Sequence, residues 1–254
     1  PYQDANNGGT NMLFRNEGDF QFLNATAQTG LDANNTRYSL AAAWEDYDND
    51  GDVDLYVAND YGQNCLYRND EGRFENVAAE SGIEDMASGM STDWGDFNRD
   101  GWMDLYIGNM WSSAGGRITF HPQFQPESNR STKVKLQRLA RGNSLFSNNG
   151  DGTFTDETTV ANLAEPTHLL VGYSPAFLDY DNDMDLDLFV TNGHFQDIIE
   201  SLSAAYTYAQ KDQLYQNNGA ETFFDVSFSA GDYFQQKCVG RGLSLADYDN
   251  DGDT

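Results

Sequence analysis

A nine-residue acidic pattern recurs along the chain and constrains its fold more than any other feature. It reads DYDNDGDVD at residues 46–54, DFNRDGWMD at 96–104 and DYDNDMDLD at 179–187, and residues 247–254 begin it again as DYDNDGDT. Each complete copy is followed at once by an apolar run typical of a β-strand, which reads LYV, LYI or LFV. Copies of one pattern in the same register predict a repeat architecture, in which each copy belongs to one structural unit.

A second pattern, running from a leucine to an asparagine, recurs between the acidic copies. It reads LFRN at 13–16, LYRN at 66–69, LFSN at 145–148 and LYQN at 214–217, and a glycine and then a phenylalanine follow each copy. The distance from each leucine to the next acidic copy is nearly constant, whereas the distance from each acidic copy to the next leucine varies. The variable stretches predict insertions on one face of a repeated unit.

These patterns predict four short extended segments in each unit. The first segment ends at the acidic copy, and the second is the apolar run after it. The third is the leucine-to-asparagine run, and the fourth begins at the phenylalanine. No regular helical stretch recurs between these segments, so we expect an all-β chain, a β-propeller of four-stranded blades with calcium-binding loops, rather than a solenoid of β–α units.

We expect residues 1–254 to form a single fragment of such a propeller. The expected parts are a partial blade at 11–32, blades at 38–83, 88–163 and 170–231, and the start of a next blade at 240–254, with an insertion at 111–142. The sequence opens in a third segment and stops inside an acidic copy. We therefore expect about four visible blades of a larger ring.

Asp or Asn occupies almost every odd position of the acidic pattern, and this alternation predicts calcium loops. Ca²⁺ takes about six to eight oxygen ligands, and carboxylates this close together repel one another without a cation. Trp102 stands at the seventh position of its copy and has no side-chain oxygen, so we expect the seventh residue to bind through its backbone carbonyl. We expect three complete Ca²⁺ sites and a truncated fourth. The candidate ligands are Asp46, Asp48, Asp50, Asp52, Asp54, Asp96, Asn98, Asp100, Trp102, Asp104, Asp179, Asp181, Asp183, Asp185, Asp187, Asp247, Asp249, Asp251 and Asp253.

Other interpretations of the acidic copies fit less well. An EF-hand needs a bidentate glutamate at its twelfth position, where these copies have Val57, Ile107 and Val190. Mg²⁺ resists dehydration and favours fewer protein ligands. A plain solvated acidic turn is the other alternative, and four copies in register argue against it. Met184 replaces the glycine found at the sixth position of the other copies, so we expect this copy to adopt a different turn or to bind its ion more weakly.

The charge balance bears on the partners of the chain. There are 14 Lys and Arg residues against 41 Asp and Glu, and the formal net charge is −27. This charge argues against nucleic acid and against an anionic membrane surface as partners. No apolar run of about 18 residues is present, so no transmembrane segment is expected. The two cysteines, Cys65 and Cys238, leave open whether they pair.

Basic residues gather in the insertion at 111–142. We consider two roles for them: a docking loop for an acidic partner or a sulfated glycan, and a cap that packs on the propeller and neutralises nearby carboxylates. The second half of the insertion, residues 131–141, places apolar residues among cations and is compatible with a short helix. The candidate docking residues are Arg130, Lys133, Lys135, Arg138 and Arg141.

Catalytic motifs give little support for an enzyme. The three histidines, His121, His168 and His194, lie far apart and lack the paired spacing of a metal site. No nucleophile elbow or phosphate loop is present. We expect His194 to be a hydrogen-bonded structural residue. The aromatic residues two positions before the acidic copies, Trp44, Trp94 and Phe177, are expected to belong to the core.

The two patterns together resemble the FG-GAP/VCBS repeats of integrin-α-like β-propellers. The order of the segments 192–194 (NGH), 213–217 (QLYQN) and 240–242 (GRG), followed by the last acidic copy, is most similar to the cartilage-acidic-protein type associated with ASPIC/UnbV domains. The resemblance covers nearly the whole chain except the insertion. It implies a secreted or cell-surface propeller, extracellular or periplasmic, whose ring commonly has seven blades and whose calcium ions are structural.

From these observations we expect a calcium-binding extracellular β-propeller that acts as a binding or adhesion module through its inter-strand loops. Its protein or glycan ligand is left open. The alternative is an extracellular enzyme or lectin that acts on polysaccharide, with its site in the central funnel or on other blades. A lectin would need repeated pockets between blades that combine aromatic and polar side chains.

Overall fold

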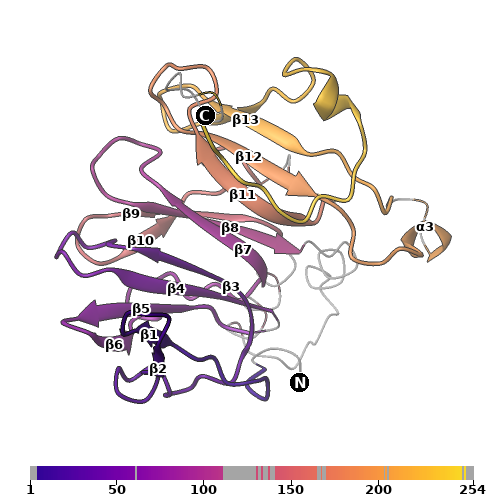
Figure 1. The fold of residues 1–254 in the computed structure, drawn as a ribbon. Coiled ribbons are helices and arrows are strands. Elements are labelled where there is room, and N and C mark those ends of the chain that lie inside the picture. Colours follow the sequence, from indigo (N-terminus) through magenta and orange to yellow (C-terminus); the bar gives the residue numbers. More distant parts are fainter. Residues whose placement is uncertain are drawn as a thin grey trace.

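The computed structural model describes residues 5–60, 62–110, 130, 133, 137, 141–164, 167, 170–202, 204, 206–247 and 249. This part of the chain is almost entirely β-structure, arranged in small sheets that stack side by side (Figure 1). The first sheet contains two strands, β1 (Phe14–Asn16) and β2 (Phe22–Asn24). The other three sheets contain four strands each: β3 (Tyr38–Glu45), β4 (Asp54–Asp60), β5 (Cys65–Asp70) and β6 (Arg73–Asn76); β7 (Ser88–Gly95), β8 (Asp104–Met110), β9 (Ser144–Asn148) and β10 (Phe154–Asp156); β11 (Gly172–Leu178), β12 (Asp187–Asn192), β13 (Gln213–Asn217) and β14 (Phe223–Asp225).

Each four-stranded sheet is an antiparallel meander in which every strand pairs with the next one along the chain. The orders are β3-β4-β5-β6, β7-β8-β9-β10 and β11-β12-β13-β14. The first strand of each sheet carries a register irregularity at the same place, between Ser39 and Ala41, between Gly89 and Ser91, and between Gly172 and Ser174. The sheets are therefore copies of one blade, and the prediction of an all-β chain of four-stranded propeller blades is confirmed.

The apolar run after each acidic copy forms the second strand, which lies inside its sheet. In β4 and β8 the first six residues are all buried, and in β12 five of the six are. A strand covered on both faces reads as a nearly continuous apolar run rather than an alternating one. This explains why LYV, LYI and LFV carry no polar alternation.

Side chains from two successive blades interlock to form each core. Between the first two complete blades, Tyr47, Tyr56 and Ile83 pack with Leu105 and Phe146 of the next blade. Between the second and third, the cluster comprises Phe97, Tyr106, Leu145, Ala161, Leu163, Phe177, Leu188, Val190, Tyr215 and Phe223. The hydrophobic core therefore lies between the sheets, and each blade needs a neighbour to bury its faces.

A backbone hydrogen bond repeats at every blade junction. The N–H of the phenylalanine that opens the fourth segment donates to a carbonyl in the turn that follows the previous sheet. The pairs are Phe74 to Thr29 (2.8 Å), Phe154 to Ser81 (2.8 Å) and Phe223 to Ala161 (3.0 Å). The glycine–phenylalanine step of the sequence thus marks a contact between blades as well as the start of a strand.

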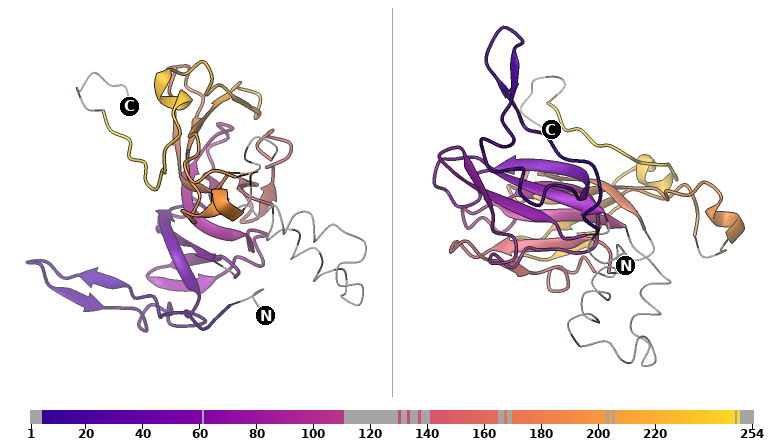
Figure 2. Two further views of the ribbon diagram at one scale, coloured as in Figure 1. Left: turned by 90° about the vertical axis from the view of Figure 1, so that its right-hand side faces the viewer. Right: turned by 90° about the horizontal axis from the view of Figure 1, so that it is seen from below.

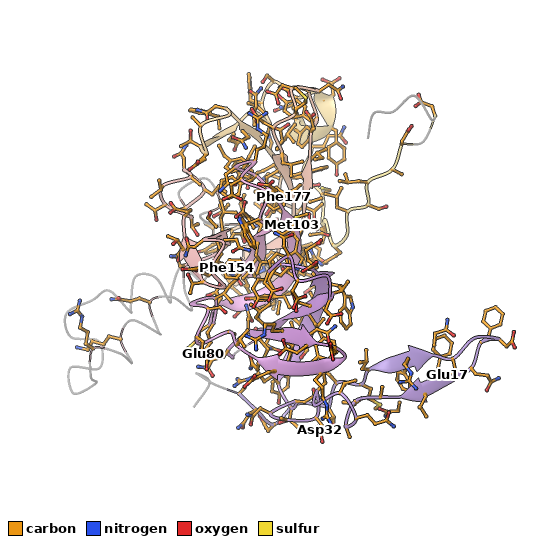
Figure 3. The ribbon with its side chains drawn as sticks, turned by 90° about the vertical axis from the view of Figure 1, so that its left-hand side faces the viewer. Glu17, Asp32, Glu80, Met103, Phe154 and Phe177 are labelled. Carbon is orange, nitrogen blue, oxygen red and sulfur yellow. The ribbon has the colours of Figure 1, made fainter. Side chains whose placement is uncertain are left out.

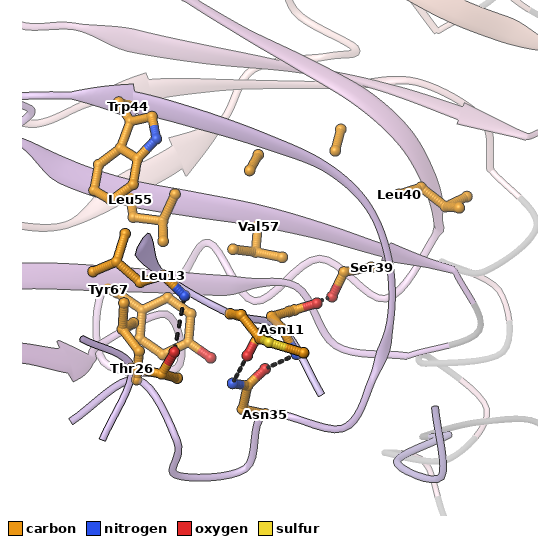
Figure 4. A pocket seen from close by; sticks show the side chains of 14 residues that line it. Asn11, Leu13, Thr26, Asn35, Ser39, Leu40, Trp44, Leu55, Val57 and Tyr67 are labelled. Atoms are coloured by element: carbon orange, nitrogen blue, oxygen red, sulfur yellow. Dashed lines mark hydrogen bonds between the residues drawn. The ribbon is translucent and has the colours of Figure 1, made fainter. Parts of the chain in front are cut away.

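The outer face of the first complete blade is only partly covered. The β1–β2 hairpin extends away from the body of the protein, with Glu17 at its far end, whereas Phe154 and Phe177 lie within the stack (Figures 2 and 3). In consequence Trp44 is 44% exposed, although its counterpart Trp94 packs against the core. The expectation that Trp44 is a core residue is therefore wrong, because the facing sheet has only two strands. Trp44, Leu55, Val57 and Tyr67 instead line an open pocket of about 470 Å³ (Figure 4).

Helical structure is minor in the described part of the chain. The short helix α3 (Ile199–Leu202) lies in the long connection between β12 and β13, and the 3-10 helix η1 (Asp232–Gln235) follows β14. In the insertion, Arg130, Lys133 and Gln137 are described, and all three are helical. No described helix has the length and apolar character needed to cross a bilayer.

Candidate metal centres

Three acidic loops join the first strand to the second strand of successive blades. Loop 1 (residues 46–54) connects β3 to β4, loop 2 (96–104) connects β7 to β8, and loop 3 (179–187) connects β11 to β12. The loops contact one another in sequence order. Asn49 Nδ2 donates to the Gly101 carbonyl at 3.3 Å, and Arg99 forms a 2.8 Å ion pair with Asp185. The fold therefore brings together three loops that are far apart in the chain.

The first aspartate of each loop shapes the turn. Asp46 accepts the backbone N–H groups of Asp50 (3.1 Å) and Gly51 (3.0 Å) on its two carboxylate oxygens. Asp96 and Asp179 accept the equivalent pairs of N–H groups in loops 2 and 3. One hydrogen-bond scheme thus builds all three loops.

The sixth residue of each loop has a positive φ, including the one that is not glycine. The angles are 95° at Gly51, 89° at Gly101 and 71° at Met184. The expectation that Met184 imposes a different turn is therefore wrong: the first-aspartate hydrogen bonds hold it in the glycine-like conformation. A bulky residue in this region is strained. The weaker ion binding expected of loop 3 stays a prediction.

The ninth aspartate of each loop is fully buried and is bonded through both oxygens. Asp54, Asp104 and Asp187 each have 0% exposure. One oxygen accepts the N–H of the loop's second residue, and the other accepts the N–H of the asparagine that ends or nearly ends the third strand. The donors are Tyr47 and Asn69 for Asp54, Phe97 and Asn148 for Asp104, and Tyr180 and Asn217 for Asp187. Each ninth aspartate is therefore a fixed point between the loop and the sheet.

Carboxylate oxygens converge in loops 1 and 3. Asp46, Asp48 and Asp50 each offer an oxygen within 4.8 Å of the others, and so do Asp179, Asp181 and Asp187. In loop 1, Asp48 Oδ1 is buried without any hydrogen-bond donor, which is costly for a carboxylate. A divalent cation bound here would supply the missing partner. The donor set consists of hard oxygens, which suits Ca²⁺, Mg²⁺ or Mn²⁺.

Loop 2 differs at its third position, where Asn98 carries an amide in place of a carboxylate. Asn98 Oδ1 accepts the N–H of Asp100 at 3.1 Å, and Asn98 Nδ2 donates to Asp100 Oδ2 at 3.1 Å. At the first, third and fifth positions, loop 2 therefore has two carboxylates, whereas loop 3 has three. An amide oxygen is still an acceptable ligand for a hard cation.

The side chains at the seventh position of each loop contact groups outside that loop. Asp52 accepts the N–H of Glu71 at 2.7 Å, and Asp185 pairs with Arg99 of the previous blade. Trp102 lies against Gly150, where an added Cβ would come within 2.8 Å of the indole ring. These contacts agree with a seventh residue that offers its backbone carbonyl rather than its side chain.

Several predicted residues fall at or beyond the limits of the described structure. Of the fourth acidic copy, Asp247 and Asp249 are described, whereas Asp251 and Asp253 lie outside the described residues, as do Lys135, Arg138, His121 and His168. Arg130 is exposed and Lys133 is half-buried. Arg141 forms a 2.8 Å ion pair with Asp156 and donates to Thr158, so its charge is used within its own blade.

Other reactive side chains have structural surroundings. His194 is buried, its Nδ1 accepts the N–H of Gln196 at 3.0 Å, and burial lowers its pKa. Arg241 donates to the His194 carbonyl at 2.8 Å. Cys65 and Cys238 are both free thiols. The Cys238 thiol donates to Asp212 Oδ2 at 3.3 Å.

Sequence reasoning missed the role of the third-strand asparagines. Asn69, Asn148 and Asn217 were read only as markers of a strand, yet each positions a ninth aspartate through its backbone N–H. Asparagine is disfavoured in strands. Its recurrence at one position of every repeat was the signal that pointed to a specific hydrogen-bonding role.

A comparison with protein-family models agrees with this arrangement. The model described as "FG-GAP-like repeat" matches residues 46–107. Residues 46–107 are thus similar to an FG-GAP-like repeat. The matched stretch begins at the first aspartate of loop 1 and ends inside β8, so it spans loop 1, strands β4 to β7 and loop 2. No curated protein matches the chain.

The stability of the metal-free protein should fall as the pH rises from about 4 to about 7. Burial raises the pKa of Asp54 and Asp104 to about 7 and that of Asp187 to about 6, from 3.8. Between the ordinary pKa of 3.8 and these raised values, the folded protein holds protons that the unfolded chain has lost, so the free energy of unfolding decreases as the pH rises. The measurement is the thermal midpoint against pH in metal-free buffer.

The control is the same pH series in saturating Ca²⁺. The cation favours the ionised carboxylates, so the fall should be reduced or reversed. If the plots of thermal midpoint against pH are parallel with and without Ca²⁺, the cation does not change the protonation of the ninth aspartates.

Proposed function

We propose that the chain is a calcium-binding extracellular β-propeller that acts as a binding or adhesion module, with calcium in a structural role. The main support is the repeated loop scheme: three loops share one hydrogen-bond pattern, loops 1 and 2 lie in the stretch that matches the FG-GAP-like repeat, and loops 1 and 3 each bring three carboxylates together. Calcium is preferred to Mg²⁺ because five oxygen ligands from one loop suit its larger coordination shell. The relation to the cartilage-acidic-protein type is part of the same proposal.

The proposed extracellular location and binding role rest on the repeat and on the shape of the units. FG-GAP repeats are typical of extracellular proteins, and loops carried on rigid blades commonly provide recognition surfaces. The basic insertion, with Arg130 exposed, is the proposed contact for an acidic partner. In this role calcium fixes the loop conformations and the blade junctions, while other loops make the contacts.

Calorimetric titration tests the metal function. We expect about three Ca²⁺ ions to bind per chain, because three complete loops are present, and Mg²⁺ to bind more weakly. Adhesion to immobilised extracellular-matrix proteins, measured with and without chelator, then tests the binding role. Absence of saturable binding in millimolar Ca²⁺ would overturn the proposal.

A cavity between the first two complete blades favours a lectin as the second candidate. It measures about 430 Å³ and is lined by Trp102, Arg68, Asp48 and Thr153, among others. It combines an aromatic ring with polar groups beside loop 1, as a sugar site requires. At the next junction, Asp185 occupies the position of Trp102 and pairs with Arg99, so the aromatic ring is not repeated there. Calcium-dependent signals on a glycan array that vanish in Trp102→Ala would favour the lectin.

A further inference from the structure

Two asparagines connect loops 2 and 3 to the acidic loop of the preceding blade. Asn148 donates its backbone N–H to Asp104 of loop 2 at 2.8 Å and its side-chain Nδ2 to the Tyr47 carbonyl of loop 1 at 2.8 Å. Asn217 does the same one blade later, with Asp187 of loop 3 and the Phe97 carbonyl of loop 2, again at 2.8 Å in both cases. One residue therefore holds the ninth ligand of one loop and the second residue of another.

The second residue of each loop closes the connection. Tyr47 donates its N–H to Asp54 of loop 1, and Phe97 donates its N–H to Asp104 of loop 2 (3.2 Å each). The result is an unbroken series of hydrogen bonds through all three loops. It runs Asp54, Tyr47, Asn148, Asp104, Phe97, Asn217, Asp187, Tyr180.

Most of the side chains in this series are buried, which makes the connection stiff. Asn148 and Asn217 are 3% and 1% exposed, and the three ninth aspartates are fully buried. Water cannot readily replace a hydrogen bond at such positions, so a broken link leaves a polar group without a partner. A displacement of one ninth carboxylate is therefore passed to the next loop rather than absorbed by solvent.

From this geometry we propose that successive metal loops bind their ions cooperatively, with Asn148 and Asn217 as the positioning residues that couple them. The inference rests on the proposed metal-binding function. An ion bound at loop 2 would hold Asp104 in its bonded position, and Asn148, which is bonded to Asp104, would in turn hold the Tyr47 peptide that bonds to Asp54 of loop 1. The ions thereby also tighten the junctions between blades.

The first blade provides a matched control. Asn69 has the same position in its strand and the same N–H bond to Asp54, but its Nδ2 donates to the Val53 carbonyl of its own blade. Among the described residues, it reaches no loop of a preceding sheet. Asn69→Ala removes the side-chain donor without cutting a connection between loops.

Residue-resolved NMR titration with Ca²⁺ tests the coupling. The amides of Gly51, Gly101 and Met184 each bond to the first aspartate of their own loop, so they report loops 1, 2 and 3 separately. In the unmodified protein we expect the Gly51 and Gly101 signals to titrate together with a Hill coefficient above one. In Asn148→Ala they should separate, with a midpoint shift of at least about fivefold, the lower end of ordinary coupling factors. Asn69→Ala should leave the steepness unchanged.

A second variant keeps the test decisive where Asn148→Ala does not fold. Asp50→Ala removes a ligand of loop 1 and should raise the Ca²⁺ midpoint at Gly101 by at least about fivefold, although Asp50 makes no contact with loop 2. An unchanged Gly101 midpoint, or independent titration of the three reporters in the unmodified protein, would overturn the coupling and leave metal binding intact. If no reporter responds to Ca²⁺, the proposed function itself fails.

Discussion

Removing divalent ions should lower the thermal unfolding midpoint by about 15 °C or more. An ion that binds only the folded state stabilises it by about 2.7 kcal/mol when its concentration is a hundred times the dissociation constant. Three such sites would contribute about 8 kcal/mol, and 1 kcal/mol shifts the midpoint of a domain of this size by about 2–4 °C. Without the ions, the carboxylates at each loop repel one another in a partly desolvated site.

Differential scanning calorimetry in millimolar Ca²⁺ and in excess chelator measures this shift. The matched control replaces the first aspartate of all three loops, Asp46, Asp96 and Asp179, with alanine, which destroys the turn that gathers the ligands. Chelator should then have no further effect on the midpoint. Equal midpoints for the unmodified protein in both conditions would mean that the loops carry no structural ion.

Replacing Asp54 by alanine should reduce the free energy of unfolding in Ca²⁺ by about 5 kcal/mol and abolish ion binding at loop 1. The truncation leaves the N–H groups of Tyr47 and Asn69 without an acceptor, at about 1–3 kcal/mol each when buried. The lost ion adds about 2.7 kcal/mol. Urea denaturation and calorimetric stoichiometry, which should drop by one ion, are the measurements.

The neighbouring aspartate in the same loop is the matched control. Asp52 is two positions earlier, and its side chain accepts the N–H of Glu71 at an exposed site. Asp52→Ala should therefore cost about 1 kcal/mol or less and leave the ion bound through the backbone carbonyl. Loss of the loop 1 ion in Asp52→Ala would show that the seventh side chain is a ligand after all.

The repeated units were predictable because their signals are local. The alternating aspartates, the following apolar run and the glycine–phenylalanine step each describe one short stretch of chain, and all recur at matching distances. The predicted third strand at 145–148 is observed as β9 (Ser144–Asn148). A repeated pattern also averages out the errors that affect any single strand prediction.

Met184 and Trp44 show where local reasoning failed. The positive φ of Met184 is held by the hydrogen bonds that the backbone N–H groups of Asp183 and Met184 donate to the Asp179 carboxylate, and these override the intrinsic preference of the residue. The exposure of Trp44 depends on how many strands face it in the adjacent sheet. The turn at Met184 therefore depends on an aspartate of its own loop, five residues earlier, whereas the exposure of Trp44 depends on a separate sheet.

By itself, the sequence determined the repeated four-stranded unit, the acidic loop between its first two strands, and the chemical class of ligand those loops offer. Only the tertiary structure decided that Asn148 and Asn217 reach across to the Tyr47 and Phe97 carbonyls of preceding blades. The physical reason is one of range. Strand and turn preferences act between near neighbours in the chain, whereas these hydrogen bonds form only after whole sheets have stacked and excluded water from the groups between them.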